Sequence, residues 1–210
     1  DRDGNGTERR ARRGAETAGV RPASFRQPRR AITMIDREGY RANVGIVLLH
    51  DMAQVFWGRR IGMSAWQFPQ GGIQEHESPR AAMFRELTEE TGLLEHHVEV
   101  IGCTDGWLRY RLPKRYIRRH QKPVCIGQKQ RWFVLRLAAD EKHVDLNQGD
   151  EPEFDDWRWI DYWDSLRGVV EFKRDVYKRA LSELAPLVRE TTQADLPLSP
   201  RAAKPGSRRR

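Results

Sequence analysis

The chain has 210 residues and a mass of 24.5 kDa, which is enough for one ordinary domain and excludes a large multidomain enzyme. It is 38% hydrophobic and 32% charged, with a formal net charge of +8. The excess positive charge lies in the flanks, because residues 1–33 contribute +5 and residues 191–210 contribute +4, which leaves −1 for residues 34–190. We therefore expect a folded domain over residues 34–190, between disordered basic segments at 1–33 and 191–210.

The cysteine and hydropathy patterns indicate an intracellular protein. Cys103 and Cys125 are the two cysteines of the sequence, and their separation fits neither a disulfide framework nor a paired zinc motif. No segment approaches the roughly 18 consecutive apolar residues that cross a bilayer. We expect a cytoplasmic monomer without a membrane partner, and Met34 as a functional start.

The first predicted elements are a hairpin, with strands at 43–50 and 54–59, and a short strand at 66–68. Gly71 and Gly72 follow and predict a loop. Ser78 and Pro79 are typical of a helix start and Gly92 of a helix end, so we expect a helix over residues 79–91.

The remaining predicted elements are strands at 98–103, 131–138 and 157–160 and an amphipathic helix at 172–189. Strands and helices alternate without a regular βαβ order. The expected fold is therefore of the α/β (α+β) class, with a mixed β-sheet sandwiched between helices in an α/β/α arrangement.

The predicted helix at 79–91 carries three acidic residues on one side. Each helical residue turns about 100°, so Glu86, Glu89 and Glu90 lie within one arc, whereas Phe84 and Leu87 point away from it. Three glutamates alone are also typical of a solvated helix face. Clustered carboxylates are, however, the ligands that a hard divalent cation such as Mg²⁺ requires, which indicates metal-assisted phosphate chemistry.

The surrounding residues identify a known signature. The stretch GGIQEHESPRAAMFRELTEETGL fits the pattern G-x5-E-x7-R-E-U-x-E-E-x-G-U, where U is an aliphatic residue, at all nine fixed positions. This stretch resembles the Nudix box, the signature of hydrolases that split a nucleoside diphosphate linked to a further group. The fixed positions are Gly71, Glu77, Arg85, Glu86, Leu87, Glu89, Glu90, Gly92 and Leu93.

The resemblance implies a Nudix fold and a metal-dependent pyrophosphohydrolase. By this resemblance Glu86, Glu89 and Glu90 are the metal ligands, and Glu90 or a water on the metal supplies the base. Arg85 and Glu77 would pair to orient the helix, so Arg85 joins the expected catalytic group. Mg²⁺ is the expected metal, with Mn²⁺ or Zn²⁺ as alternatives.

A basic segment follows the box. WLRYRLPKRYIRRHQK, at 107–122, contains seven Lys or Arg and no acid, with interleaved aromatic residues. This composition fits a nucleic-acid surface, and equally a solvated basic loop with aromatic residues in the core. The chain is similar to the bacterial RNA pyrophosphohydrolases in six segments, in this order: MIDREGYRANVGIV, WQFPQGGI, WLRYRLPKR, KPVCIGQKQRWF, PEFDDWRW and VVEFKRDVY.

That closer resemblance implies a substrate and further site residues. The substrate would be the 5′ triphosphate or diphosphate end of RNA, converted to a 5′ monophosphate so that mRNA decay can proceed. Arg41 and Lys173 would bind phosphate, and Glu153 would add a metal ligand. Arg60 and Phe172 would stack on a base. Gln128 and Lys129 are weaker candidates.

Two other functions remain open from the sequence. A diadenosine polyphosphate hydrolase would share the WQFPQGGI and PEF features and the same chemistry. A non-catalytic RNA-binding module would keep the fold without turnover, although the intact box glutamates oppose it. A stimulating protein partner is unknown at this point.

Overall fold

A computed structural model describes residues 34–50, 53–149, 151–192 and 200. The two segments expected to be disordered, 1–33 and 191–210, lie outside the described residues apart from 191–192 and 200. In the described part of the chain, no helix combines the length and the apolar character that a membrane span requires.

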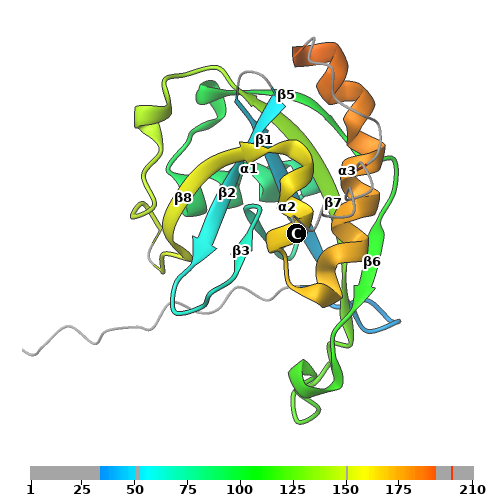
Figure 1. Ribbon diagram of the computed structural model, residues 1–210. Helices are drawn as coiled ribbons and strands as arrows, with labels where there is room; N and C mark the ends of the chain where they lie inside the picture. Colours follow the sequence, from blue (N-terminus) through cyan, green and yellow to red (C-terminus); the bar gives the residue numbers. More distant parts are fainter. Residues whose placement is uncertain (1–33, 51–52, 150, 193–199, 201–210) are drawn as a thin grey trace, which may run out of the picture. The chain divides into compact units, whose positions relative to one another are not determined.

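A mixed β-sheet forms the centre of the fold (Figure 1). Its main strand order is β3-β2-β1-β7-β5, with β4 paired to β1, β6 to β7 and β8 to β2. The strands are β1 (Tyr40–Leu49), β2 (Gln54–Arg60), β3 (Trp66–Gln67), β4 (Gln70–Gly72), β5 (Val98–Cys103), β6 (Leu108–Arg111), β7 (Gly127–Leu137) and β8 (Phe154–Asp161). The predicted hairpin is confirmed, because β1 and β2 pair antiparallel.

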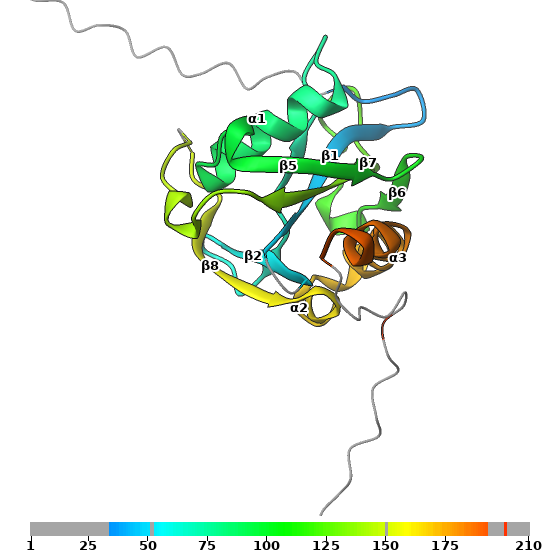
Figure 2. The same ribbon diagram turned by 90° about the horizontal axis from the view of Figure 1, so that it is seen from above.

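Helices cover both faces of this sheet, as Figure 2 shows for α1 (Pro79–Thr91) and α3 (Glu171–Thr192). Alternation along β1 divides its side chains between two hydrophobic cores. Ile46 and Leu48 pack with residues of α1, whereas Val47 and Leu49 pack with residues of α3. The expected α/β/α arrangement is therefore confirmed. A four-residue helix, α2 (Ser165–Gly168), precedes α3, and short 3-10 turns lie at Glu95–His97, Lys114–Tyr116, Glu141–His143 and Tyr162–Asp164.

The helix α1 has the bounds that its sequence predicts. The Ser78 hydroxyl accepts a hydrogen bond from the Ala81 amide at 3.1 Å, which satisfies a free N–H of the first turn. Gly92 ends the helix with φ of 72°, a left-handed conformation that glycine adopts without steric cost. Both ends of α1 are thus fixed, and with them the direction of its carboxylates.

The structure corrects the expectations for several elements. The loop predicted at Gly71 and Gly72 is wrong, because both residues belong to β4, which pairs antiparallel with β1. The strand predicted from 131 begins at Gly127, since its polar first half pairs with β1 and β6. Strand β6 lies inside the basic segment and was not predicted. Strand β8 and helix α3 are each longer than expected.

Candidate active site

Three box glutamates lie on α1 at different depths. Glu86 and Glu90 are buried, with 8% and 4% of their surfaces exposed, whereas the Glu89 side chain is 50% exposed. Leu87 is fully buried on the opposite side of the helix, among the apolar residues under the sheet. The helix therefore holds its acidic arc at the boundary between the protein interior and solvent.

Arg85 connects these carboxylates to β4 and to the loop before the helix. Its Nη1 donates to Glu86 Oε1 at 2.7 Å and to Glu89 Oε2 at 3.0 Å. Its Nε and Nη2 donate to the two Glu77 oxygens at 2.9 and 3.0 Å, and Nη2 also donates to the Gly72 carbonyl at 2.8 Å. The structure thus places Arg85 and Glu77 together as the resemblance implies.

The electrostatics of this pair favour its charged form. Burial by itself raises the pKa of Glu77, but the hydrogen bonds from Arg85 and the Gln74 amide, together with the charge of Arg85, outweigh it, so the pKa of Glu77 lies below its usual range. Glu77 also accepts from the Gln74 amide at 2.9 Å. The loop before α1 is therefore tied to the helix by a charged, twofold contact.

Gly71 leaves the space that the Glu86 carboxylate occupies. A Cβ on Gly71 would lie 1.8 Å from Glu86 Cδ and within 2.0 Å of both carboxylate oxygens. Burial, opposed by the attraction of Arg85 and aided by the charges of Glu89 and Glu153, raises the pKa of Glu86 to about 7. The strand β4 and the helix α1 are thus in contact through this carboxylate.

Glu90 reaches deepest into the protein. Its Oε2 accepts a hydrogen bond from the Gln70 amide at 2.9 Å, while its Oε1 is buried and has no partner. Burial, and then the charges of Glu153 and Glu86, hold the pKa of Glu90 well above its usual range. A buried carboxylate with a free oxygen is a position at which a bound cation would be stabilising.

Glu153 comes from outside the box, directly before β8. Its Oε2 lies 3.6 Å from Arg60 Nη2, and its charge raises the pKa of both Glu86 and Glu90. The structure therefore brings this fourth predicted carboxylate into the electrostatic neighbourhood of Glu86 and Glu90.

The donor set is of the type that a divalent cation requires, since all four side chains offer carboxylate oxygens. The free Oε1 of Glu90 also fits a metal at this place. As the side chains stand, Arg85 engages oxygens of Glu86 and Glu89. Within the described ranges, no three His, Cys, Asp or Glu side chains converge closely enough to hold one ion.

A buried polar cluster lies beside Glu90 on the α3 face of the sheet. The Gln130 amide donates to Asn43 Oδ1 at 3.1 Å and to Gln70 Oε1 at 3.3 Å. Gln70 donates to Gln67 Oε1 at 3.4 Å, and the Tyr177 hydroxyl donates to Gln70 Oε1 at the same distance. Sequence reasoning missed these five residues. No local pattern in the sequence joins them, because they come from four strands and α3.

Two predicted phosphate ligands border this cluster. Lys173 is buried and donates to Gln67 Oε1 at 3.4 Å, and burial together with the charge of Arg60 lowers its pKa to about 8. Arg41 lies beside Gln128 in the β1–β7 ladder, and its Nε is buried without a partner. Gln128 accepts from the Tyr110 hydroxyl at 2.6 Å. Lys129 instead pairs with Asp36 at 2.8 Å, away from the cluster.

Arg60 and Phe172, the predicted base-stacking pair, each contact other residues. Arg60 pairs with Glu153, and the Phe172 ring lies 6.0 Å from Tyr110 and 5.6 Å from Tyr116 between centroids. Among the described residues no cation–π contact joins Arg60 to Phe172. In the basic segment Tyr110 belongs to the core, as the interpretation of a solvated loop with core aromatic residues expects, whereas Tyr116 is 48% exposed; the nucleic-acid interpretation stays a prediction.

Comparison with known proteins defines the class of this site. The NUDIX domain family matches residues 39–180, and the chain belongs to the Nudix family. Nudix hydrolases are pyrophosphohydrolases that use divalent metal ions.

Among its relatives, a protein named RNA pyrophosphohydrolase from Thioalkalivibrio sulfidiphilus is 64% identical over 155 residues, 74% of this chain and 90% of that protein. One of the same name from Stenotrophomonas maltophilia is 58% identical over 170 residues, 81% of this chain and 82% of that protein. The structure of the E. coli dihydroneopterin triphosphate pyrophosphohydrolase has a TM-score of 0.52 at 19% identity. The match covers 66% of this chain and 92% of the chain in that structure, and it shows a likeness in fold alone.

Proposed function

We propose that this protein is an RNA 5′ pyrophosphohydrolase. It hydrolyses a phosphoanhydride of the 5′ triphosphate or diphosphate end, so that water adds to one phosphorus and pyrophosphate or phosphate leaves. The product is an RNA with a 5′ monophosphate, which promotes mRNA decay. The names of relatives that are 58–64% identical over most of this chain support the RNA substrate.

One observation carries the position of the site. Five buried side-chain polar atoms of the described residues lack a hydrogen-bond partner, and four of them lie in or beside the cluster next to Glu90. These four atoms are Arg41 Nε, Gln67 Nε2, Glu90 Oε1 and Gln130 Oε1. Since buried polar groups in folded proteins are normally paired, a polar ligand is expected to complete them.

The proposed roles of the residues follow from their chemistry. Glu86, Glu89, Glu90 and Glu153 would hold the divalent metal, for which we propose Mg²⁺. When bound, the metal neutralises phosphate charge and lowers the pKa of water. Arg85 and Glu77 orient α1. Arg41 and Lys173 are positioned to neutralise the phosphates that enter the polar cluster, and Arg60 and Phe172 to hold a base.

The test is the substitution Glu90→Gln in the full chain. Glutamine keeps an acceptor oxygen for the Gln70 amide, so the fold is preserved while the charge is lost. We expect kcat on a short triphosphorylated RNA with Mg²⁺ to fall at least about 100-fold, and RNA affinity to change by no more than a few-fold. The matched control is Glu95→Gln, an exposed glutamate past the end of α1.

Parallel assays separate the alternatives. Diadenosine tetraphosphate and a chelator control are measured beside the RNA. Faster metal-dependent turnover of the RNA supports the proposal, whereas preference for the dinucleotide moves the function to nucleotide hydrolysis at the same site. Unchanged turnover in the Glu90 variant contradicts the metal assignment. No turnover of either substrate by the wild type leaves a binding module.

A further inference from the structure

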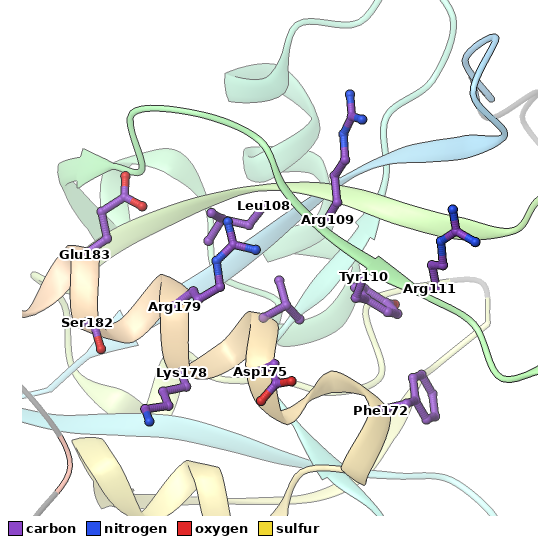
Figure 3. Close-up of a pocket in the computed structure, with 11 residues that line it drawn as sticks. Leu108, Arg109, Tyr110, Arg111, Phe172, Asp175, Lys178, Arg179, Ser182 and Glu183 are labelled. Carbon is purple, nitrogen blue, oxygen red and sulfur yellow. The ribbon is translucent and has the colours of Figure 1, made fainter.

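A cavity lies outside the carboxylate site, between β6 and α3 (Figure 3). Its volume is about 920 Å³, within the range of pockets that bind small molecules or segments of a polymer. Leu108 and Val176 line it with apolar surface, and Tyr110 and Phe172 lie toward one end of it. The cavity is therefore an elongated groove along the helix, which we call the β6–α3 groove.

Two basic side chains of this groove have no acidic partner. Lys178 and Arg179 are exposed on α3, and neither forms an ion pair with any residue that the structure describes. Arg179 extends from α3 toward β6 in Figure 3. The acidic side chains of the groove are Asp175 and Glu183, and Glu183 accepts a hydrogen bond from the Asp105 amide at 2.5 Å. Positive groups are thus available on the helix side.

The basic residues of β6 serve a different purpose. Arg109 pairs with Glu38 at 2.6 Å, and Arg111 Nε donates to the Tyr40 hydroxyl at 3.3 Å. In Figure 3 both side chains point away from α3. Lys178 and Arg179 are therefore the basic groups on which ligand binding in the groove depends.

One end of the groove lies next to residues of the candidate active site. Tyr110, which lines the groove, donates from its hydroxyl to buried Gln128 beside Arg41. Phe172, at the same end, is followed in the chain by buried Lys173. The exposed Tyr116 ring adds to this end at 5.6 Å from Phe172. Tyr110 and Phe172 therefore mark the end of the groove that is nearer to the polar cluster.

We propose that the β6–α3 groove binds the single-stranded RNA that lies 3′ of the nucleotides at the active site. This inference rests on the proposed function, because an RNA substrate carries a chain that must leave the site, whereas a dinucleotide does not. Lys178 and Arg179 neutralise its phosphodiesters, and the apolar surface and aromatic rings contact bases without reading their sequence. Two occupants would match the positive charge of the groove, a single-stranded RNA and an acidic protein surface. Asp175 would repel both, but a flexible strand can pass around its carboxylate, whereas a folded protein surface cannot.

The test compares the KM for RNA substrates of two lengths between the wild type and the double variant Lys178→Glu/Arg179→Glu of the full chain. Triphosphorylated RNAs of two and eight nucleotides with the same first two residues are hydrolysed at several salt concentrations. For the wild type we expect a lower KM for the octamer. In the double variant we expect the KM of the octamer to rise at least about fivefold more than that of the dimer, with the kcat of both kept.

A binding measurement keeps the inference separate from the proposed function. An octamer with a 5′ hydroxyl group, labelled at its 3′ end, is titrated by fluorescence anisotropy. Loss of two phosphate contacts is expected to reduce the slope of log K against log salt by about 1.4, from roughly 0.7 per phosphate for single strands. Arg189→Glu, an exposed residue ten positions further along α3, is the matched control and keeps the slope.

Each outcome has one meaning. If triphosphorylated RNA is not hydrolysed but the hydroxyl octamer binds through Lys178 and Arg179, the proposed function fails and the groove stands. If the double variant binds the octamer with the wild-type affinity and slope, the groove inference is overturned. An equal rise of KM for dimer and octamer also overturns it, and an acidic protein would then be the better candidate occupant.

Discussion

Replacing Gly71 by alanine tests whether β4 and α1 are fitted to each other through the Glu86 carboxylate. The new Cβ would lie 1.8 Å from Glu86 Cδ, whereas an ordinary contact between such atoms is about 3.5 Å. The carboxylate must therefore retreat by roughly 1.7 Å, the difference between these distances. That movement would break the 2.7 Å contact between Glu86 Oε1 and Arg85.

The expected effects on stability and activity follow from this displacement. Overpacking of a buried position costs about 1–3 kcal/mol, which lowers the Tm of a chain of this size by roughly 3–10 °C. Misplacement of a catalytic group by about 1 Å reduces turnover roughly 100-fold. Thermal unfolding and release of pyrophosphate from triphosphorylated RNA measure the two effects. Gly106→Ala is the matched control, because a Cβ there meets nothing within 4 Å.

A double-mutant cycle identifies the contact responsible. In a Glu86→Ala background the overlap disappears, so Gly71→Ala is expected to cost less than about 0.5 kcal/mol there, as coupled neighbours are non-additive. Wild-type Tm and turnover in the single Gly71 variant would refute the steric argument. An equal loss of stability in both backgrounds would place the strain elsewhere.

Two further predictions concern base binding and pH. Arg60→Ala or Phe172→Ala should raise the KM for triphosphorylated RNA about tenfold, the cost of one lost base stack, and an equal loss on inorganic tripolyphosphate would contradict a stacking role. Asp36→Asn removes the pair with Lys129, whose hydrogen bond lowers the pKa of Asp36. A lowered pKa stabilises the fold above the unfolded pKa, and this contribution is lost as pH falls through the folded pKa. The Tm of the wild type should thus exceed that of the variant by about 2 °C at pH 7 and converge with it near pH 3, whereas a gap independent of pH would argue against the pair.

Local signals in the sequence determine much of the fold. The caps at Ser78 and Gly92 predict α1 to the residue, because capping depends on side chains next to the helix ends. The first two strands follow from apolar runs around a short turn. The box spacing likewise predicts which glutamates share one side of α1, since helical geometry fixes it.

The missed features depend on contacts between distant segments. Strand β6 alternates apolar and basic residues, Leu108 with Arg109 and Tyr110 with Arg111, and its charge concealed the twofold period. The contact between Gln130 and Asn43 joins residues 87 positions apart, through the parallel pairing of β7 with β1. No local pattern indicates that pairing, so the polar cluster could be recognised only in the folded chain.

Arg85 has a consequence for the order in which the protein matures. The like charges that repel along an isolated α1 are met inside the fold by one guanidinium with contacts to Glu77, Glu86, Glu89 and the Gly72 carbonyl. Arg85 thus acts as the counter-ion of Glu86 and Glu89, and α1 packs against the sheet without a bound metal. On the proposed function, divalent ions therefore bind a helix that is already packed, and we expect their supply to govern activity and not the amount of folded protein.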